Sequence, residues 1–162
     1  FFSRHLPVLT DVAQAVSYAH SRGVIHRDIK PSQILVGEFG EVLLVDWGLA
    51  LLVDGVGGGK ADGAHGTEGL STFNNTATAV CPAGTPAYMA PEQTNGRPDG
   101  LGPWTDVYLL GGLLYYLLTG THLREGSDAA DAFLSAARGE IEAPSRRAPE
   151  LDIPDDLEAL FA

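Results

Sequence analysis

Cysteine is almost missing from this sequence. Of 162 residues only Cys81 is a cysteine, so the chain can form no internal disulfide and cannot supply the several thiolates of a structural zinc cluster. Chains without disulfides are usual in a reducing compartment. We therefore expect this segment to be cytoplasmic, although a longer protein that contains it could carry a membrane anchor elsewhere.

Basic residues are also scarce. Lys and Arg number 10 against 21 Asp and Glu, which gives a formal net charge of -11. Nucleic acids and anionic membrane surfaces are both bound through basic protein surfaces. The composition therefore argues against nucleic acid and lipid headgroups as partners.

Long apolar runs are missing as well. The segment to consider as a membrane span is residues 107–119, VYLLGGLLYYLLT, thirteen residues without a charge between Asp106 and Gly120. A membrane-spanning helix needs about 20 apolar residues. We interpret the stretch as a buried core helix and expect no membrane contact by this segment.

Enough apolar residues are present for one folded domain. With 44% hydrophobic residues the chain can bury one core. Apolar residues at intervals of three and four predict a helix over residues 3–21, followed by Gly23. The apolar runs 34–36 and 42–45 enclose a glycine-bracketed turn and predict a hairpin, and residues 128–138 predict an amphipathic helix. The apolar positions of the first helix are Leu6, Leu9, Ala13, Val16 and Ala19.

Glycine is concentrated in residues 55–69, where it fills seven of fifteen positions. Such a segment has little apolar surface to bury, so it predicts a loop. Gly59 and Lys60 suggest a phosphate-binding loop. However, Asp54 stands at the place of its first glycine and Ala61 at the place of its Ser or Thr, which argues against that interpretation.

The most informative segment is residues 26–35, HRDIKPSQIL. It places a carboxylate, an ammonium group and a carboxamide within six positions, at Asp28, Lys30 and Gln33. Phosphoryl transfer requires a positioned nucleophile, a bound magnesium ion and positive charge near the migrating group. These three side chains are suited to that chemistry.

This segment resembles the catalytic loop H-R-D-x-K-P-x-N of eukaryotic-type serine/threonine protein kinases, with Gln33 at the position of Asn. Three further resemblances follow in the family's order. Asp46-Trp47-Gly48 resembles the D-F-G element, residues 84–92 resemble the segment that ends in A-P-E, and residues 105–111 resemble the buried helix that opens with an aspartate. The chain is therefore identified as a member of this family, with motifs similar to those of its bacterial members.

The resemblance implies a fold and a domain. The expected fold is α+β and mainly helical, a kinase C-terminal lobe in which a short β-hairpin carries the catalytic loop and the Asp46-Trp47-Gly48 element. The family's N-terminal lobe would precede residue 1, and residues 154–160 read as the start of a further helix. We therefore expect residues 1–162 to be a partial kinase domain. Residues 55–69 would belong to an extended activation loop.

The resemblance also implies roles in binding ATP and Mg²⁺. Asp28 would accept or orient the proton of the substrate hydroxyl, and Lys30 would neutralise charge on the γ-phosphoryl group. Asp46 would bind magnesium together with Gln33, whose extra methylene places its carboxamide further out than that of Asn and would weaken binding. Leu35 would form the floor beneath the adenine.

Four further positions would be regulatory, namely Arg27, Thr76, Thr78 and Thr85. Arg27 would bind a phosphate on the activation loop, for which Thr76 and Thr78 are the candidates, because a phosphothreonine can order a loop by pairing with arginine. Phosphorylation of one copy by another would make a homodimer a further partner.

Four positions would be structural or contact residues. Thr85 would contact the catalytic aspartate and lysine at the substrate-binding segment. Asp106 would hydrogen-bond the backbone of the catalytic loop, and Glu92 would have a structural role. His26 is expected to be packed and not catalytic.

The predicted function is that of a serine/threonine protein kinase, which moves the γ-phosphoryl of MgATP to protein Ser or Thr hydroxyls, with the segment alone inactive. A pseudokinase that acts as a scaffold or regulatory binding module is the first alternative, favoured by Gln33 and opposed by the retained Asp28, Lys30 and Asp46. A small-molecule phosphotransferase is the second, and it lacks a counterpart of residues 84–92.

Overall fold

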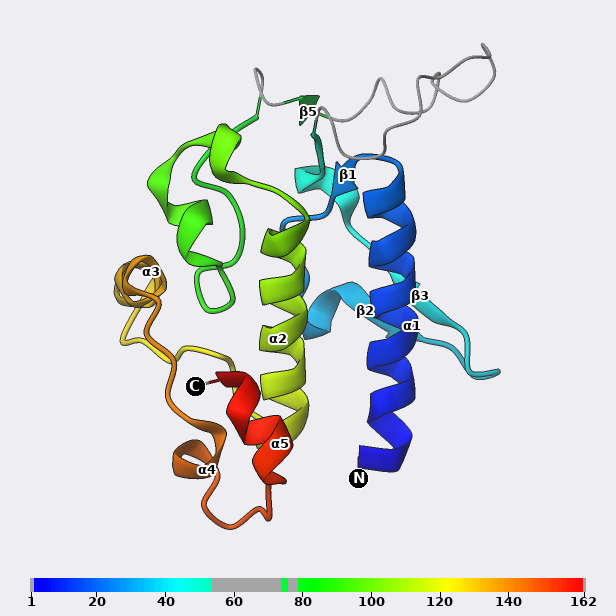
Figure 1. The fold of residues 1–162 in the computed structure, drawn as a ribbon, viewed down its shortest axis with the longest axis vertical. Coiled ribbons are helices and arrows are strands. Elements are labelled where there is room, and N and C mark those ends of the chain that lie inside the picture. The colour runs from blue at the N-terminus through cyan, green and yellow to red at the C-terminus, as the bar shows by residue number, and fades with distance from the viewer. Residues whose placement is uncertain (1, 54–73, 76–78, 162) are drawn as a thin grey trace.

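The computed structural model describes residues 2–53, 74–75 and 79–161 (Figure 1). Two long helices, α1 (Phe2–Ser21) and α2 (Pro103–Thr119), run side by side through the molecule. Shorter helices follow, namely α3 (Ala129–Arg138), α4 (Pro144–Arg147) and α5 (Asp155–Glu158). The described part of the chain is therefore mainly helical, as the sequence predicted.

Two small sheets complete the fold. β1 (Val24–Ile25) pairs antiparallel with β4 (Leu51–Leu52), which pairs parallel with β5 (Asn74–Asn75). β2 (Ile34–Val36) and β3 (Val42–Leu44) form an antiparallel hairpin with Ile34 opposite Leu44. The predicted hairpin is confirmed, one residue shorter at its second strand. It projects from the body of the molecule (Figure 1), and Phe39 at its turn is 95% exposed.

Helix α1 follows the predicted bounds but turns a slightly different face to the core. Val12, Val16 and Ala19 are buried, whereas Leu6 is exposed and Ala13 is only partly buried. The apolar pattern in the sequence therefore predicted a buried face that includes Leu6 and Ala13, whereas the observed buried face is rotated away from them. Gly23 adopts a left-handed φ of 73° that ends the helical segment.

Helix α2 begins four residues before the predicted start. Pro103 occupies its first turn, where a missing N–H costs no hydrogen bond, and Gly120 ends it with a left-handed φ of 72°. Leu109 and Leu113 lie in the core with α1 residues. Val107 is 61% exposed, so the first turns of the helix reach the surface.

The C-terminal segments close the lower part of the core. α3 begins at Asp128, whose Oδ1 accepts hydrogen bonds from the N–H groups of Ala130 and Asp131, which satisfies two otherwise unpaired donors. Phe161 contacts Tyr115 edge to face at 5.5 Å. No helix in the described ranges is both long and apolar enough to cross a membrane.

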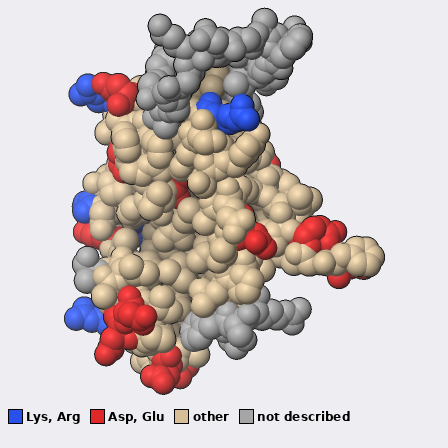
Figure 2. Space-filling view, turned by 45° about the vertical axis from the view of Figure 1, so that its right-hand side comes forward, with Lys and Arg blue, Asp and Glu red and all other residues tan. Residues whose placement is uncertain are grey.

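Charged side chains are spread over the surface shown in Figure 2. Asp and Glu are more frequent there than Lys and Arg and do not form one continuous patch. This distribution agrees with the acidic composition.

Candidate active site

The segment between β1 and β2 is held by a buried aspartate of α2. Oδ2 of Asp106 accepts the backbone N–H of His26 and Oδ1 accepts that of Arg27, both at 2.8 Å. Oδ2 also lies 2.8 Å from Nε2 of His20. Arg27 has a left-handed φ of 71°, an unfavourable backbone conformation for a residue with a side chain. The two hydrogen bonds that Asp106 accepts from the backbone stabilise this conformation.

His26 is packed inside the same segment. Its ring lies 4.5 Å from that of Trp47, and Nε2 donates to the carbonyl of Val45 at 3.1 Å. Nδ1 therefore carries no proton and accepts the N–H of Asp28 at 3.3 Å. Burial lowers the pKa of His26, which outweighs the nearby carboxylates. The neutral ring of His26 packs between the segment that carries Asp28 and the segment that carries Trp47.

Asp28, Lys30 and Thr85 form a closed set of contacts. Nζ of Lys30 donates to Oδ2 of Asp28 at 2.7 Å and to Oγ1 of Thr85 at 2.6 Å. The hydroxyl of Thr85 donates to Oδ1 of Asp28 at 2.6 Å. Thr85 thus meets Asp28 and Lys30 although it lies 55 to 57 residues away from them in the chain. The carboxylate of Asp28 still has free lone pairs after it accepts these two hydrogen bonds.

Asp46 is connected to Asp28 through the side chain of Gln33. The carboxamide Nε2 of Gln33, a buried side chain, donates to Oδ2 of Asp46 at 2.9 Å and lies 3.5 Å from Oδ2 of Asp28. Asp46 is exposed and adopts a left-handed φ of 62° at the start of a short 3-10 turn, Trp47–Leu49. Gln33 therefore bridges the carboxylates of the two aspartates.

The guanidinium of Arg27 is buried between two loop segments. Nε donates to the carbonyl of Leu49 at 2.6 Å, and Nη1 lies 3.7 Å from the sulfur of Cys81. Nη2 is buried without a hydrogen-bond partner. Thr76 and Thr78, the predicted phosphorylation sites, lie outside the described residues.

Leu35 lies on the outer face of the hairpin. It is 52% exposed and sits opposite Leu43, which is 54% exposed. These two leucines give the hairpin an apolar surface next to the segment that carries Gln33.

Glu92 lies in the 3-10 segment Pro91–Asn95. Its Oε1 accepts the hydroxyl of Thr105, a buried residue in the first turn of α2, at 2.9 Å. This contact ties the segment to the helix that also carries Asp106.

Two buried polar residues were not singled out from the sequence. Nε2 of Gln93 donates to the carbonyls of Arg27 at 2.8 Å and Ala83 at 3.0 Å, so it joins the catalytic-loop segment to the segment that carries Thr85. Gly84 lies so close that a Cβ would meet Nε2 of Gln93 at 3.0 Å. Only contacts across the fold distinguish this glutamine from an exposed one.

Arg124 is the second such residue. Its guanidinium donates to the carbonyls of Met89 and Glu140, each at 2.9 Å, and to the hydroxyl of Tyr108. The side chain is only 4% exposed. It anchors the loop that follows α2 against the segment before Pro91.

The oxygen ligands at this site suit a hard divalent cation. Asp46 offers a carboxylate and Gln33 a carboxamide oxygen if its amide turns over, and Mg²⁺ is commonly held by one or two such protein ligands together with phosphate oxygens and water. Within the described ranges no group of three or more His, Cys, Asp or Glu side chains could hold a metal ion. The residues therefore fit a magnesium ion shared with a phosphate group, and do not fit an all-protein metal site.

Comparison with known proteins gives the family. The sequence model named "Protein kinase domain" matches residues 6–157. Serine/threonine-protein kinase PknD of Protochlamydia amoebophila is 37% identical over 147 residues, which cover 91% of this chain and 15% of that protein. The PknD proteins of Chlamydia caviae and Chlamydia pneumoniae are 37% and 34% identical over 94% and 96% of this chain. The chain spans only 15% to 16% of the length of these relatives.

The match with the family covers all four motifs. In the structure, polar residues of the first three motifs meet at one site. Asp106, from the fourth motif, is joined to this site by a hydrogen bond from the backbone of the first. The chain belongs to the protein kinase family.

Proposed function

We propose that this chain is part of the C-terminal lobe of a serine/threonine protein kinase. The complete protein would transfer the γ-phosphoryl of MgATP to Ser or Thr hydroxyls of a protein substrate. The observation that carries this proposal is the closed contact of Asp28 with Lys30 and Thr85, joined to Asp46 through Gln33. The names of the bacterial relatives support it.

Asp28 is the residue that orients the substrate hydroxyl and accepts its proton. Its carboxylate is held by Thr85 on one oxygen and by Lys30 on the other, so its direction is set before substrate arrives. Lys30 lies beside it and supplies positive charge where the γ-phosphoryl group gains negative charge. These two side chains form the catalytic pair.

Asp46 and Gln33 would hold the magnesium ion. When bound, the ion neutralises phosphate charge and orients the transferable group. Leu35 would support the adenine through its exposed side chain on the hairpin. ATP binds between two lobes in this family, so we expect residues 1–162 alone to be inactive.

The remaining predicted residues would regulate or support the site. Arg27 would bind a phosphate on Thr76 or Thr78 through its free Nη2, and a homodimer would allow one copy to phosphorylate the other. Glu92 and Asp106 would hold the surrounding segments in place.

A pseudokinase is the second candidate function. The orientation of Gln33 favours a pseudokinase, because its amide group donates a hydrogen bond to Asp46. This hydrogen bond compensates the negative charge of the carboxylate without a bound cation. A protein of this kind would keep the fold and bind partners without transferring phosphate.

The deciding experiment measures magnesium-dependent transfer from labelled ATP by the complete protein that contains this chain. Asp28→Asn should lower the rate by about 10² to 10⁴, and removal of magnesium should abolish transfer. Asp152→Asn, at an exposed position, is the matched control. An inert parent that Gln33→Asn restores would indicate a weakened kinase site, while inactivity of parent, Asp28→Asn and Gln33→Asn alike would favour the scaffold.

A further inference from the structure

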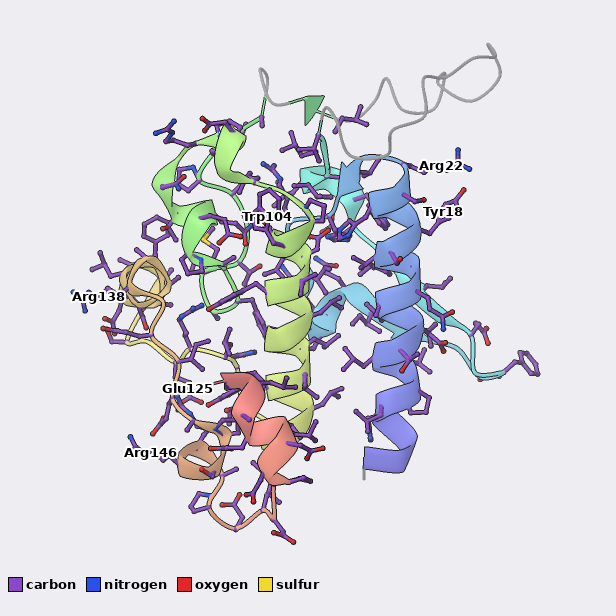
Figure 3. The ribbon with its side chains drawn as sticks, viewed as in Figure 1. Tyr18, Arg22, Trp104, Glu125, Arg138 and Arg146 are labelled. Atoms are coloured by element: carbon purple, nitrogen blue, oxygen red, sulfur yellow. The ribbon has the colours of Figure 1, made fainter. Side chains whose placement is uncertain are left out.

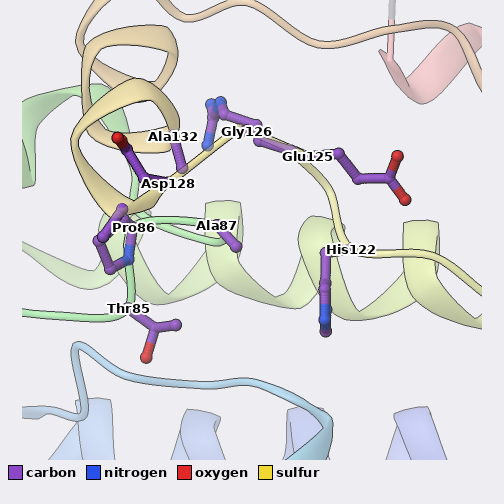
Figure 4. A pocket seen from close by; sticks show the side chains of 10 residues that line it. Thr85, Pro86, Ala87, His122, Glu125, Gly126, Asp128 and Ala132 are labelled. Atoms are coloured by element: carbon purple, nitrogen blue, oxygen red, sulfur yellow. The ribbon is translucent and has the colours of Figure 1, made fainter.

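Two hollows lie on either side of a strip made by Thr85, Ala87 and His122, which line both. The larger has a volume of about 630 Å³ and is also lined by Lys30, Pro31, Ser32, Tyr88 and Tyr116. The smaller has a volume of about 480 Å³ and includes Pro86 and Asp128 (Figure 4). Both volumes fall in the range of ligand-binding pockets.

The strip lies next to the catalytic pair. Thr85 donates to Asp28, and Lys30 contacts both of them. Under the proposed function, a peptide whose hydroxyl reaches Asp28 therefore comes next to this strip. An extended peptide advances about 3.3 Å per residue and sends successive side chains to opposite faces. Neighbours of the phosphorylated residue thus come within reach of the hollows.

The ring of His122 lies between the two hollows and is held in place by contacts with two tyrosines. Its ring stacks on Tyr116 with 6.0 Å between centroids and 24° between planes, and meets Tyr88 edge to face at 5.4 Å. The hydroxyl of Tyr88 lies 2.7 Å from Nδ1 of His122. Burial raises the pKa of Tyr88 far above its ordinary value, so the hydroxyl keeps its proton and can donate a hydrogen bond to the ring of His122. The imidazole is exposed on its remaining side.

The larger hollow selects by ring contacts and charge. Tyr116 and His122 present ring surfaces, and aromatic pairs gain energy beyond the area that they bury. Lys30 also lines this hollow, and its ammonium group offers hydrogen-bond donors but no acceptor to a basic side chain. In Figure 4, Thr85 and His122 extend in the same direction while the carboxylate of Glu125 points away. Glu125 also pairs with Arg147 at 2.7 Å, so its carboxylate already has a basic partner.

We propose that His122 and Tyr116 are specificity-determining residues that bind an aromatic side chain of the protein substrate close to the phosphorylated Ser or Thr. The proposal rests on the proposed kinase function, because that function brings a peptide to Asp28. It adds the class of substrate sequence that the site prefers.

A binding experiment tests the proposal without phosphate transfer. Alanine-based peptides, with Ala in place of the hydroxyl residue, carry one Phe at successive positions around the centre. Their Kd for the complete protein is measured by fluorescence anisotropy. Phe at one position should tighten binding about tenfold relative to Ala, and Lys at that position should bring no gain.

Variants of His122 and Tyr116 test whether these two rings cause the preference for Phe. His122→Ala and Tyr116→Leu should abolish the preference for Phe, and His122→Phe should keep it because the ring remains. Tyr18→Ala is the matched control, since Tyr18 is an exposed ring on α1 that lines neither hollow (Figure 3). Equal Kd values for Phe and Ala peptides at every position, or a preference that survives in His122→Ala, would overturn the proposal.

A kinetic experiment separates this proposal from the proposed function. With Ser-containing peptides, His122→Ala should raise the KM of the preferred Phe peptide about tenfold and change kcat much less. Transfer by the parent without any preference for Phe contradicts the aromatic subsite alone. Binding that prefers Phe, in a parent that transfers no phosphate to any peptide, contradicts the kinase function alone.

Discussion

Asp28 is a buried carboxylate whose two oxygens both receive hydrogen bonds from the chain. Burial of an ionised carboxylate is unfavourable unless charged or polar donors compensate it. Lys30 and Thr85 provide that compensation and at the same time fix the direction of the group. At this position stability and orientation depend on the same contacts.

Under the proposed function, the hydroxyl of Thr85 should be required for fast phosphoryl transfer by the complete protein. Thr85→Val keeps the shape but removes the donor to Asp28 and the acceptor for Lys30. Since a hydrogen bond to a charged group is worth about 1.5 to 3 kcal/mol, we expect kcat to fall about 10- to 100-fold. Thr85→Ser, which keeps the hydroxyl, should retain most of the rate in the same steady-state assay. An active Thr85→Val protein would contradict the role of this contact.

His26 should make stability depend on pH. Burial lowers its pKa in the folded protein below the ordinary value near 6.5, despite the opposing carboxylates of Asp106, Asp28 and Asp46. Between these two pKa values the unfolded chain binds the extra proton, so the free energy of unfolding falls as pH decreases below 6.5. The slope for one such group is at most about 1.4 kcal/mol per pH unit.

Urea denaturation at pH 7.5 and pH 5.5 measures this effect. His26→Phe keeps a ring beside Trp47 but cannot titrate, so its stability should decline less over the same interval. Most carboxylates titrate below this range, and the other histidines are common to both proteins. An identical decline in parent and variant would show that His26 is not the group responsible.

The first turn of α2 organises the loops around it. The hydroxyl of Thr105 donates a hydrogen bond to Glu92. Asp106 accepts two backbone N–H groups of the segment between β1 and β2 and also contacts His20. A rigid helix thus positions residues that are themselves in irregular backbone. The segment between β1 and β2 depends on α2 because it has few regular hydrogen bonds of its own.

Asp106→Asn should loosen that loop. The amide group offers one acceptor oxygen where the carboxylate offers two, so either His26 or Arg27 keeps a buried N–H without a partner. We expect a loss of about 1 to 3 kcal/mol in the free energy of unfolding. Hydrogen exchange at the two amides should become faster. Asp152→Asn serves as the exposed control, and exchange rates equal to those of the parent would refute this account.

At the scale of the whole molecule, α1, α2 and the short C-terminal segments share one core. Val12 and Val16 of α1, Leu109 and Leu113 of α2, and Leu123 after α2 belong to the same buried cluster. The hairpin packs its inner side on this cluster and leaves its outer side exposed. The site lies where the segments around the hairpin, the first turn of α2 and the segment that carries Thr85 meet.

Leu109→Ala should destabilise the entire domain. Leu109 is 1% exposed, and removal of such a side chain typically costs about 2 to 5 kcal/mol through lost burial and a residual cavity. Leu134→Ala on α3, where the side chain is 53% exposed, should change stability by less than about 0.5 kcal/mol. Denaturant midpoints measured on the complete protein compare the two. Similar midpoints would mean that the core does not depend on α2 in this way.

Much of the local structure was predictable from the sequence. The sequence predicted a helix over residues 3–21 from apolar periodicity, a helix over 107–119 from an uncharged apolar run, and the hairpin from apolar runs around a glycine-bracketed turn, because these signals act between near neighbours. The spacing of the motifs likewise placed Asp28, Lys30 and Asp46 on segments next to those elements. The apolar stripe of α1 was less accurate, since the partner helix decides which side is buried.

By itself the sequence determined the family, the order of the motifs and the residue types that phosphoryl transfer needs. Only the tertiary structure decided that Gln33 lies between the two aspartates, that Gln93 joins Arg27 to Ala83, and that His122 stands between two hollows. The physical reason is distance along the chain. Arg27 and Gln93 are 66 positions apart, and a contact of that kind depends on how the elements pack and not on local propensity.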